Sequence, residues 1–214
     1  MGKANALAAQ LIATLPSGIA GLFNPYRDHC PMDAPGNGPE QKTARLAAHL
    51  DRVPRFVCVG EGPGYQGARY SGVAFTSERL LIEGAIPGIA AIGHRLSVRG
   101  NPFSEPSATI VWTTLYRLQI AENTLLWNCV QLHPHRLGEP WSNRTPTPDE
   151  VAIGQPALRL LKEAFPEAHF VAVGAKAKAA LETAGIAAMA VRHPANGGAS
   201  LFAQGMAKVI EQAR

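Results

Sequence analysis

The chain has 214 residues, of which 46% are hydrophobic and 17% are charged, and its formal net charge is +4. This composition excludes a disordered or low-complexity protein, and no apolar stretch is long enough to span a membrane. Residues 1–214 are most simply one domain with one core. The modest excess of Lys and Arg suits a nucleic-acid partner, although the chain has no run of five basic residues.

The expected elements alternate between helices and strands along the chain. Residues 1–22 carry apolar positions at helical spacing, which favours an amphipathic helix over a signal peptide. Further helices are expected over residues 41–51, 76–83, 108–120, 149–165, 174–184 and 201–212. Strands are expected over residues 55–59, 124–130, 169–173 and 187–191. The alternation predicts a three-layer α/β/α fold with a central, mainly parallel four-stranded sheet.

The three cysteines, Cys30, Cys58 and Cys129, are widely spaced and form no Cys-x-x-Cys pair. Such cysteines are typical of buried, reduced thiols in a cytoplasmic protein. The His133-Pro134-His135 segment matches no common zinc spacing, so we expect no metal site.

The most informative segment is a strand that ends in the turn Gly60-Glu61-Gly62-Pro63-Gly64. The glycines allow positive φ and the close approach of a ligand, and the proline stiffens the turn. Glu61 stands where a strand ends, which in open α/β sheets is where ligands bind. The turn therefore predicts a carboxylate held rigidly against a bound ligand.

Three further segments combine with this turn into a pattern. They are residues 72–78 (GVAFTSE), residues 126–130 (LWNCV) with 143–148 (NRTPTP), and residues 192–198 (RHPANGG). In this order and at these separations, the four segments resemble the uracil-DNA glycosylase superfamily over roughly residues 55 to 200. The turn is most similar to the branch whose first motif reads Gly-Glu-Ala-Pro-Gly. Position 62 is Gly here, however, and the cysteines that hold the iron–sulfur cluster of that branch are missing.

The resemblance implies that the protein removes uracil or a related deaminated base from DNA. Glu61 would position the attacking water or stabilise positive charge on the sugar. His193 would donate a hydrogen bond to uracil O2, where negative charge accumulates as the bond breaks. Phe75 would stack on the flipped base, and the amide of Asn128 would bind the N3 and O4 edge of the base.

The resemblance assigns supporting roles to residues around these four. Gly60, Gly62 and Tyr65 would line the base pocket. Arg144 is expected either to contact a DNA phosphate or to anchor its own loop. Gly197 and Gly198 would belong to the loop that lies against DNA.

Two alternatives use the same segments. A Rossmann-like protein could cradle a nucleotide phosphate in the glycine-rich turn, but Glu61 would repel the phosphate, and the dinucleotide and P-loop motifs are missing. A non-catalytic nucleic-acid-binding protein could keep the pocket without turnover. Because no Lys occurs in any of the four segments to form a Schiff base, we expect a monofunctional glycosylase. We also expect the protein to be a monomer. We expect this enzyme to need neither a metal nor an organic cofactor.

Overall fold

The structure is a computed structural model that describes residues 2–213. Its helices are α1 (Lys3–Ala13), α2 (Pro39–Leu50), α3 (Ala68–Ser71), α4 (Glu78–Ile82), α5 (Pro106–Arg117), α6 (Pro148–Ile153), α7 (Gln155–Ala164), α8 (Ala175–Thr183) and α9 (Ala199–Gln212). Its strands are β1 (Leu22–Phe23), β2 (Phe56–Gly60), β3 (Thr124–Asn128), β4 (His133–Pro134), β5 (His169–Val173) and β6 (Ala188–Val191). Within these residues, no helix combines the length and apolar character needed to cross a membrane.

The main sheet of the described residues has four strands in the order β3-β2-β5-β6, and all of its neighbouring pairs are parallel. Its register pairs Gly60 at the end of β2 with Asn128 at the end of β3. Parallel strands end at one edge of a sheet, so the segments that follow β2, β3, β5 and β6 all leave from that edge. The predicted parallel four-stranded sheet is confirmed.

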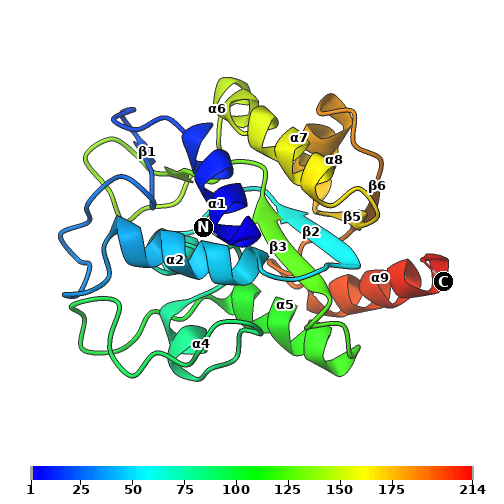
Figure 1. The fold of residues 1–214 in the computed structure, drawn as a ribbon, viewed down its shortest axis with the longest axis horizontal. Helices are drawn as coiled ribbons and strands as arrows, with labels where there is room; N and C mark the ends of the chain where they lie inside the picture. Colours follow the sequence, from blue (N-terminus) through cyan, green and yellow to red (C-terminus); the bar gives the residue numbers. More distant parts are fainter. Residues whose placement is uncertain (1, 214) are drawn as a thin grey trace.

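Helices cover both faces of this sheet. Successive residues of a strand point to opposite faces, so alternate residues of β2 contact different helices. Val57 and Val59 of β2 pack into one buried cluster with residues of α1, α2, α7 and α8. Phe56 and Cys58 pack into a second cluster with residues of α4, α5 and α9. In Figure 1, α7 and α8 lie above the sheet, and α5 and α9 lie below it. The predicted three-layer arrangement is therefore confirmed.

Two parts of the chain differ from the expected elements. The helix expected over residues 149–165 is divided at Gly154 into α6 and α7. A Cβ atom at Gly154 would overlap the carbonyl oxygen of Cys129, so the backbone there passes against the segment that follows β3. The loop expected over residues 133–148 begins with β4, which pairs antiparallel with β1 in a small second sheet. This second sheet brings Pro134 to the end of β3, beside the glycine-rich turn.

Candidate active site

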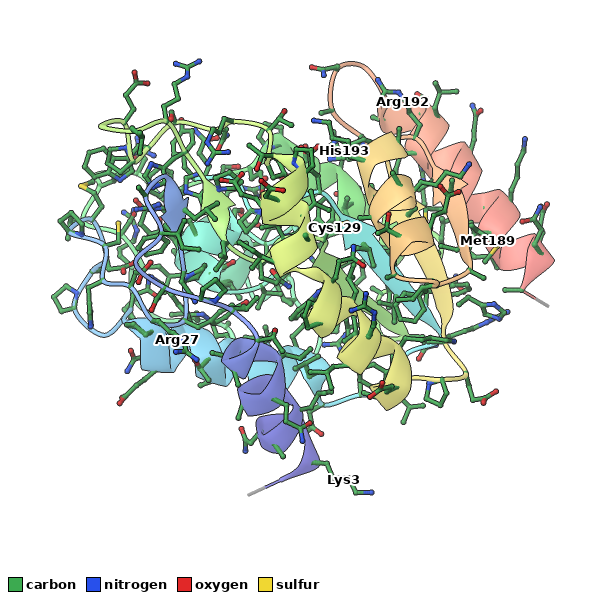
Figure 2. The ribbon with its side chains drawn as sticks, turned by 90° about the horizontal axis from the view of Figure 1, so that it is seen from above. Lys3, Arg27, Cys129, Met189, Arg192 and His193 are labelled. Carbon is green, nitrogen blue, oxygen red and sulfur yellow. The ribbon has the colours of Figure 1, made fainter. Side chains whose placement is uncertain are left out.

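A cavity of about 440 Å³ opens at the carboxyl ends of the strands. The structure brings Glu61, Phe75, Asn128 and His193 together in its lining, although they come from separate segments of the chain. Figure 2 shows His193 and its neighbour Arg192 at one end of the molecule, on the opposite side of the view from Lys3. The loops that follow β2, β3 and β6 thus contribute to a single site.

The floor of the cavity depends on Gly60 having no side chain. A Cβ atom at Gly60 would lie 2.5 Å from Cζ of Phe75 and 2.8 Å from Oδ1 of Asn128. Phe75 itself has a φ of 50°, a left-handed conformation that is rare for a bulky residue. Such strain persists only where the surroundings enforce it, and it clusters at functional sites. The ring of Phe75 is thereby held with its centroid 6.1 Å from that of the His193 ring.

Asn128 is the last residue of β3, and only 2% of its surface is exposed. Its side chain nevertheless lines the cavity. None of the side-chain hydrogen bonds formed within residues 2–213 involves its amide. A buried amide needs hydrogen-bond partners. The Asn128 amide is therefore available to a ligand that enters the cavity, with one acceptor and two donor positions.

The hydrogen bonding of His193 determines which ring nitrogen can act on a ligand. The backbone N–H of Ala195 donates to Nδ1 of His193 over 3.1 Å, so in the neutral ring Nε2 carries the proton. Burial has the largest effect on the pKa of His193 and lowers it. The charge of Glu61 raises this pKa, and the charge of Arg192 lowers it, so the net shift is downward. His193 is therefore a neutral imidazole with a donor at Nε2.

Glu61 pairs with a residue that the four sequence segments do not contain. Nζ of Lys176, in the first turn of α8, lies 3.0 Å from Oε1 of Glu61 and 2.9 Å from Oγ1 of Thr145. The Glu61 side chain is 33% exposed, and that of Lys176 is 53% exposed. Glu61 and Thr145 also line a second hollow of about 390 Å³, and Lys176 lines this second hollow but not the main cavity. The position of Lys176 at the start of the helix that follows β5 is the one sequence signal that could have indicated it.

A second carboxylate in the cavity, that of Glu105, was not predicted. Glu105 precedes α5 and packs against the turn, where a Cβ atom at Gly67 would overlap its Oε2. Burial raises the pKa of Glu105 to about 7, and no side-chain hydrogen bond caps the helix. Acidic residues are common at helix starts because they interact favourably with the helix dipole. The sequence alone therefore offered no signal that Glu105 would line the cavity.

A chain of hydrogen bonds orients the amide of Asn143. Nη1 of Arg69 can only donate, so Nδ1 of His133, 2.8 Å away, accepts. Nε2 of His133 then donates to Oδ1 of Asn143 over 3.2 Å, and the backbone N–H of Tyr65 donates to the same oxygen over 2.9 Å. Burial and the charge of Arg69 lower the pKa of His133 to about 3, which keeps this ring neutral. The Asn143 oxygen is thus used within the protein, and its NH₂ group is left for the cavity that it lines.

The structure places Tyr65 outside the main cavity, whereas Arg144 lines the cavity and is paired within its own loop. The Tyr65 side chain does not belong to the lining of the main cavity; its ring packs edge-to-face on Phe103, with centroids 6.0 Å apart. The guanidinium of Arg144 binds both carboxylate oxygens of Glu150, at 2.6 and 2.7 Å, and donates to the carbonyl of His135 over 3.0 Å. Arg144 therefore anchors its own loop, and a phosphate contact would require this ion pair to break.

The expected glycines have steric roles. Gly62 lines the cavity, whereas Gly60 lies directly beneath Phe75. Gly197 has a φ of 74°, and a Cβ atom at Gly198 would overlap the carbonyl oxygen of His193. These two glycines shape the loop that presents His193. Within residues 2–213, no group of three His, Cys, Asp or Glu residues is placed to hold a metal ion.

Comparison with known proteins identifies the family. The model of the uracil DNA glycosylase superfamily matches residues 48–203, more than half of the chain. The crystal structure of wild-type SMUG2 from Pedobacter heparinus has a similar fold, with a TM-score of 0.62 and 15% sequence identity; the match covers 96% of this chain and 97% of that chain. No curated protein matches the sequence. The chain thus belongs to the uracil DNA glycosylase superfamily.

Proposed function

We propose that the protein is a monofunctional DNA glycosylase that hydrolyses the N-glycosidic bond of uracil or a related deaminated base in DNA. The observation that carries this proposal is the meeting of an aromatic ring, a free amide, a neutral imidazole and a carboxylate in one cavity. Enzymes of this kind turn the target nucleotide out of the duplex and read the flipped base in a pocket.

Phe75 and Asn128 bind the base in this proposal. The Phe75 ring offers a stacking face that tolerates any base. The Asn128 amide supplies selectivity, because its NH₂ donates to uracil O4 while its oxygen accepts from N3–H. Both side chains are held against Gly60, so little ordering is needed when the base enters.

His193 stabilises the departing base. As the bond between C1′ and N1 breaks, its electron pair moves onto the base and negative charge collects on O2. Nε2–H of the neutral His193 donates to this oxygen. A donor that is oriented in advance, here by the Ala195 N–H on Nδ1, stabilises developing charge without reorganisation.

Glu61 acts on the sugar and on the water. Its carboxylate stabilises positive charge at C1′ and accepts a proton from the water whose oxygen bonds to C1′. The products are an abasic sugar and the base anion, which becomes the free base by taking a proton from solvent, while Glu61 releases the proton that it accepted. Lys176, which also donates to Thr145, holds the Glu61 carboxylate and is therefore a positioning residue in this mechanism.

The test is single-turnover base release from oligonucleotides that contain uracil, hypoxanthine or xanthine, in single- and double-stranded form. His193→Ala is expected to lower the rate by ~10²–10³, as the loss of one oriented donor does. Glu61→Gln is expected to slow release more than it weakens DNA binding, and Asn128→Ala is expected to reduce the discrimination between bases.

The non-catalytic alternative predicts a different pattern. A parent protein that binds DNA but releases none of these bases would contradict the proposed activity. Release by Glu61→Gln at the parent rate would show instead that Glu61 is only a turn residue.

A further inference from the structure

An aromatic hollow of about 280 Å³ lies beside the candidate active site and has no role in the mechanism above. We call it the Tyr65–Trp141 pocket. Its lining consists of Met32, Tyr65, Gln66, Arg99, Phe103 and Trp141.

The Tyr65–Trp141 pocket is linked to the main cavity by the backbone, because lining residues of the two hollows follow one another in the chain. Tyr65 and Gln66 directly follow the glycine-rich turn that lines the cavity. The backbone N–H of Tyr65 donates to Oδ1 of Asn143 over 2.9 Å, and Asn143 lines the cavity. A DNA strand whose target base occupies the cavity therefore has its neighbouring nucleotide within reach of the pocket.

The walls of the pocket are aromatic and fixed. The ring of Tyr65 meets Phe103 edge-to-face, and Nε2 of Gln66 donates to the Tyr65 hydroxyl over 2.8 Å. Phe103 in turn stacks on the buried Tyr70, with centroids 4.6 Å apart. Trp141 remains 43% exposed, which is unusual for so large an apolar side chain. An exposed aromatic wall beside a DNA site is suited to stacking.

Arg99 adds a positive charge at the edge of this pocket. Its guanidinium lies 4.3 Å from the centroid of the Phe103 ring. The ion pairs formed within residues 2–213 do not include Arg99, so its charge is available to an anion. Proteins that bind single-stranded nucleic acid stack bases on aromatic side chains and place positive charges near the phosphates, and this pocket offers both kinds of group.

We propose that the Tyr65–Trp141 pocket binds the unpaired nucleobase next to the target nucleotide, with the base stacked on Trp141 and the adjoining phosphate near Arg99. This inference rests on the proposed function for the identity of the target nucleotide, whereas stacking in the pocket itself needs only an unpaired base. A base that is still paired in a duplex cannot enter the pocket. The pocket therefore favours single-stranded DNA over duplex DNA.

Tryptophan fluorescence tests the pocket without any base release. Trp112 and Trp127 are each only 1% exposed, so Trp141 is the indole of this chain that a ligand can reach. Oligothymidine, which contains no uracil, is expected to quench the emission of the parent protein. Duplex DNA of the same length and at the same salt concentration is expected to quench it less.

Affinity for labelled oligothymidine supplies the matched comparison. Trp141→Ala is expected to weaken binding by roughly 5- to 150-fold, the range that loss of one stacked base gives, and Trp141→Phe should restore most of the affinity. Arg99→Ala should lower the dependence of binding on salt, because one phosphate contact is lost. Tyr116→Ala and Arg159→Ala change exposed residues away from the pocket and are expected to bind like the parent.

The results of these experiments distinguish a failure of the pocket proposal from a failure of the proposed glycosylase activity. If Trp141→Ala binds oligothymidine with the parent affinity, the proposed role of the pocket in binding a base is wrong, whatever the rate of base release. Quenching by the duplex that equals or exceeds quenching by the single strand would also overturn it. Quenching and affinity that behave as expected in a protein that releases no base would contradict the proposed function and leave the pocket supported.

Discussion

Gly60 shows how a single missing side chain shapes the candidate site. Phe75 and Asn128 both approach the space that a Cβ atom at this position would take. Gly60→Ala is expected to displace one of them and to lower single-turnover base release by at least ~10-fold, with a stability loss of about 1–3 kcal/mol from overpacking. Gly93→Ala, which meets nothing within 4 Å, is the control. A Gly60→Ala protein with parent activity would show that the ring and the amide need no such space.

The partly buried carboxyl of Glu105 makes stability depend on pH. Its pKa is about 7 in the folded protein against an ordinary value of 4.5, so the folded state binds the proton more tightly than the unfolded state. The favourable protonated form is fully present below pH 4.5, and its contribution is lost as the pH rises through 7. Glu105→Gln is expected to match the parent near pH 5 and to melt at a higher temperature at pH 8.

Thermal unfolding at several pH values between 5 and 8 checks this expectation. The exposed Glu163→Gln is the matched control and is expected to keep the pH dependence of the parent. Parallel melting curves for the parent and Glu105→Gln at every pH would show that Glu105 is ionised in the folded protein throughout.

Lys176 is expected to matter for activity through its ion pair with Glu61. The ion pair with Glu61 is exposed, so its contribution to stability is at most about 1 kcal/mol. Lys176→Met is expected to melt within a few degrees of the parent, yet to lower base release on the order of 10-fold, because Glu61 loses its anchor. Lys176→Arg can still pair and should keep most of the activity. Equal rates for Met and Arg would contradict a positioning role.

At the scale of elements, the break between α6 and α7 has a local cause and a packing cause: Pro156 in the first turn of α7 cannot donate a helical hydrogen bond, and Gly154 is packed closely. Gly154 allows the helical segment to approach the backbone that follows β3, where a Cβ atom would overlap the carbonyl oxygen of Cys129. Gly154→Ala is expected to reduce the free energy of unfolding by about 1–3 kcal/mol in urea titrations, despite the higher helix propensity of Ala. Gly100→Ala, in open space, should stay close to the parent. A more stable Gly154→Ala protein would mean that the break has no packing cause.

Other elements followed directly from local patterns. The strand expected over residues 169–173 is β5, and those expected over residues 55–59 and 124–130 differ from β2 and β3 by one or two residues. Continuous apolar runs identify such strands because both of their faces are covered. The two-residue strands β1 and β4 and the single turn α3 were not predicted, since segments this short have no detectable periodicity.

At the scale of the whole molecule, topology explains why distant residues share one cavity. All strands of the main sheet are parallel, so the segments after β2, β3 and β6 leave from the same edge. Glu61, Asn128 and His193 each stand at or just beyond such a strand end. Their convergence could be expected once the sheet was expected to be parallel. Their chemical roles remain the proposal made above.

Local spacing and residue type were enough to predict the alternation of strands and helices, the glycine-rich turn and the family. Tertiary structure alone decided which side chains meet. Lys176 pairs with Glu61, which lies 115 residues earlier in the chain. The Glu105 side chain packs against Gly67, and the Tyr65 ring packs on Phe103 outside the main cavity. Such contacts depend on how loops of irregular backbone pack on one another, and no periodic pattern encodes that packing.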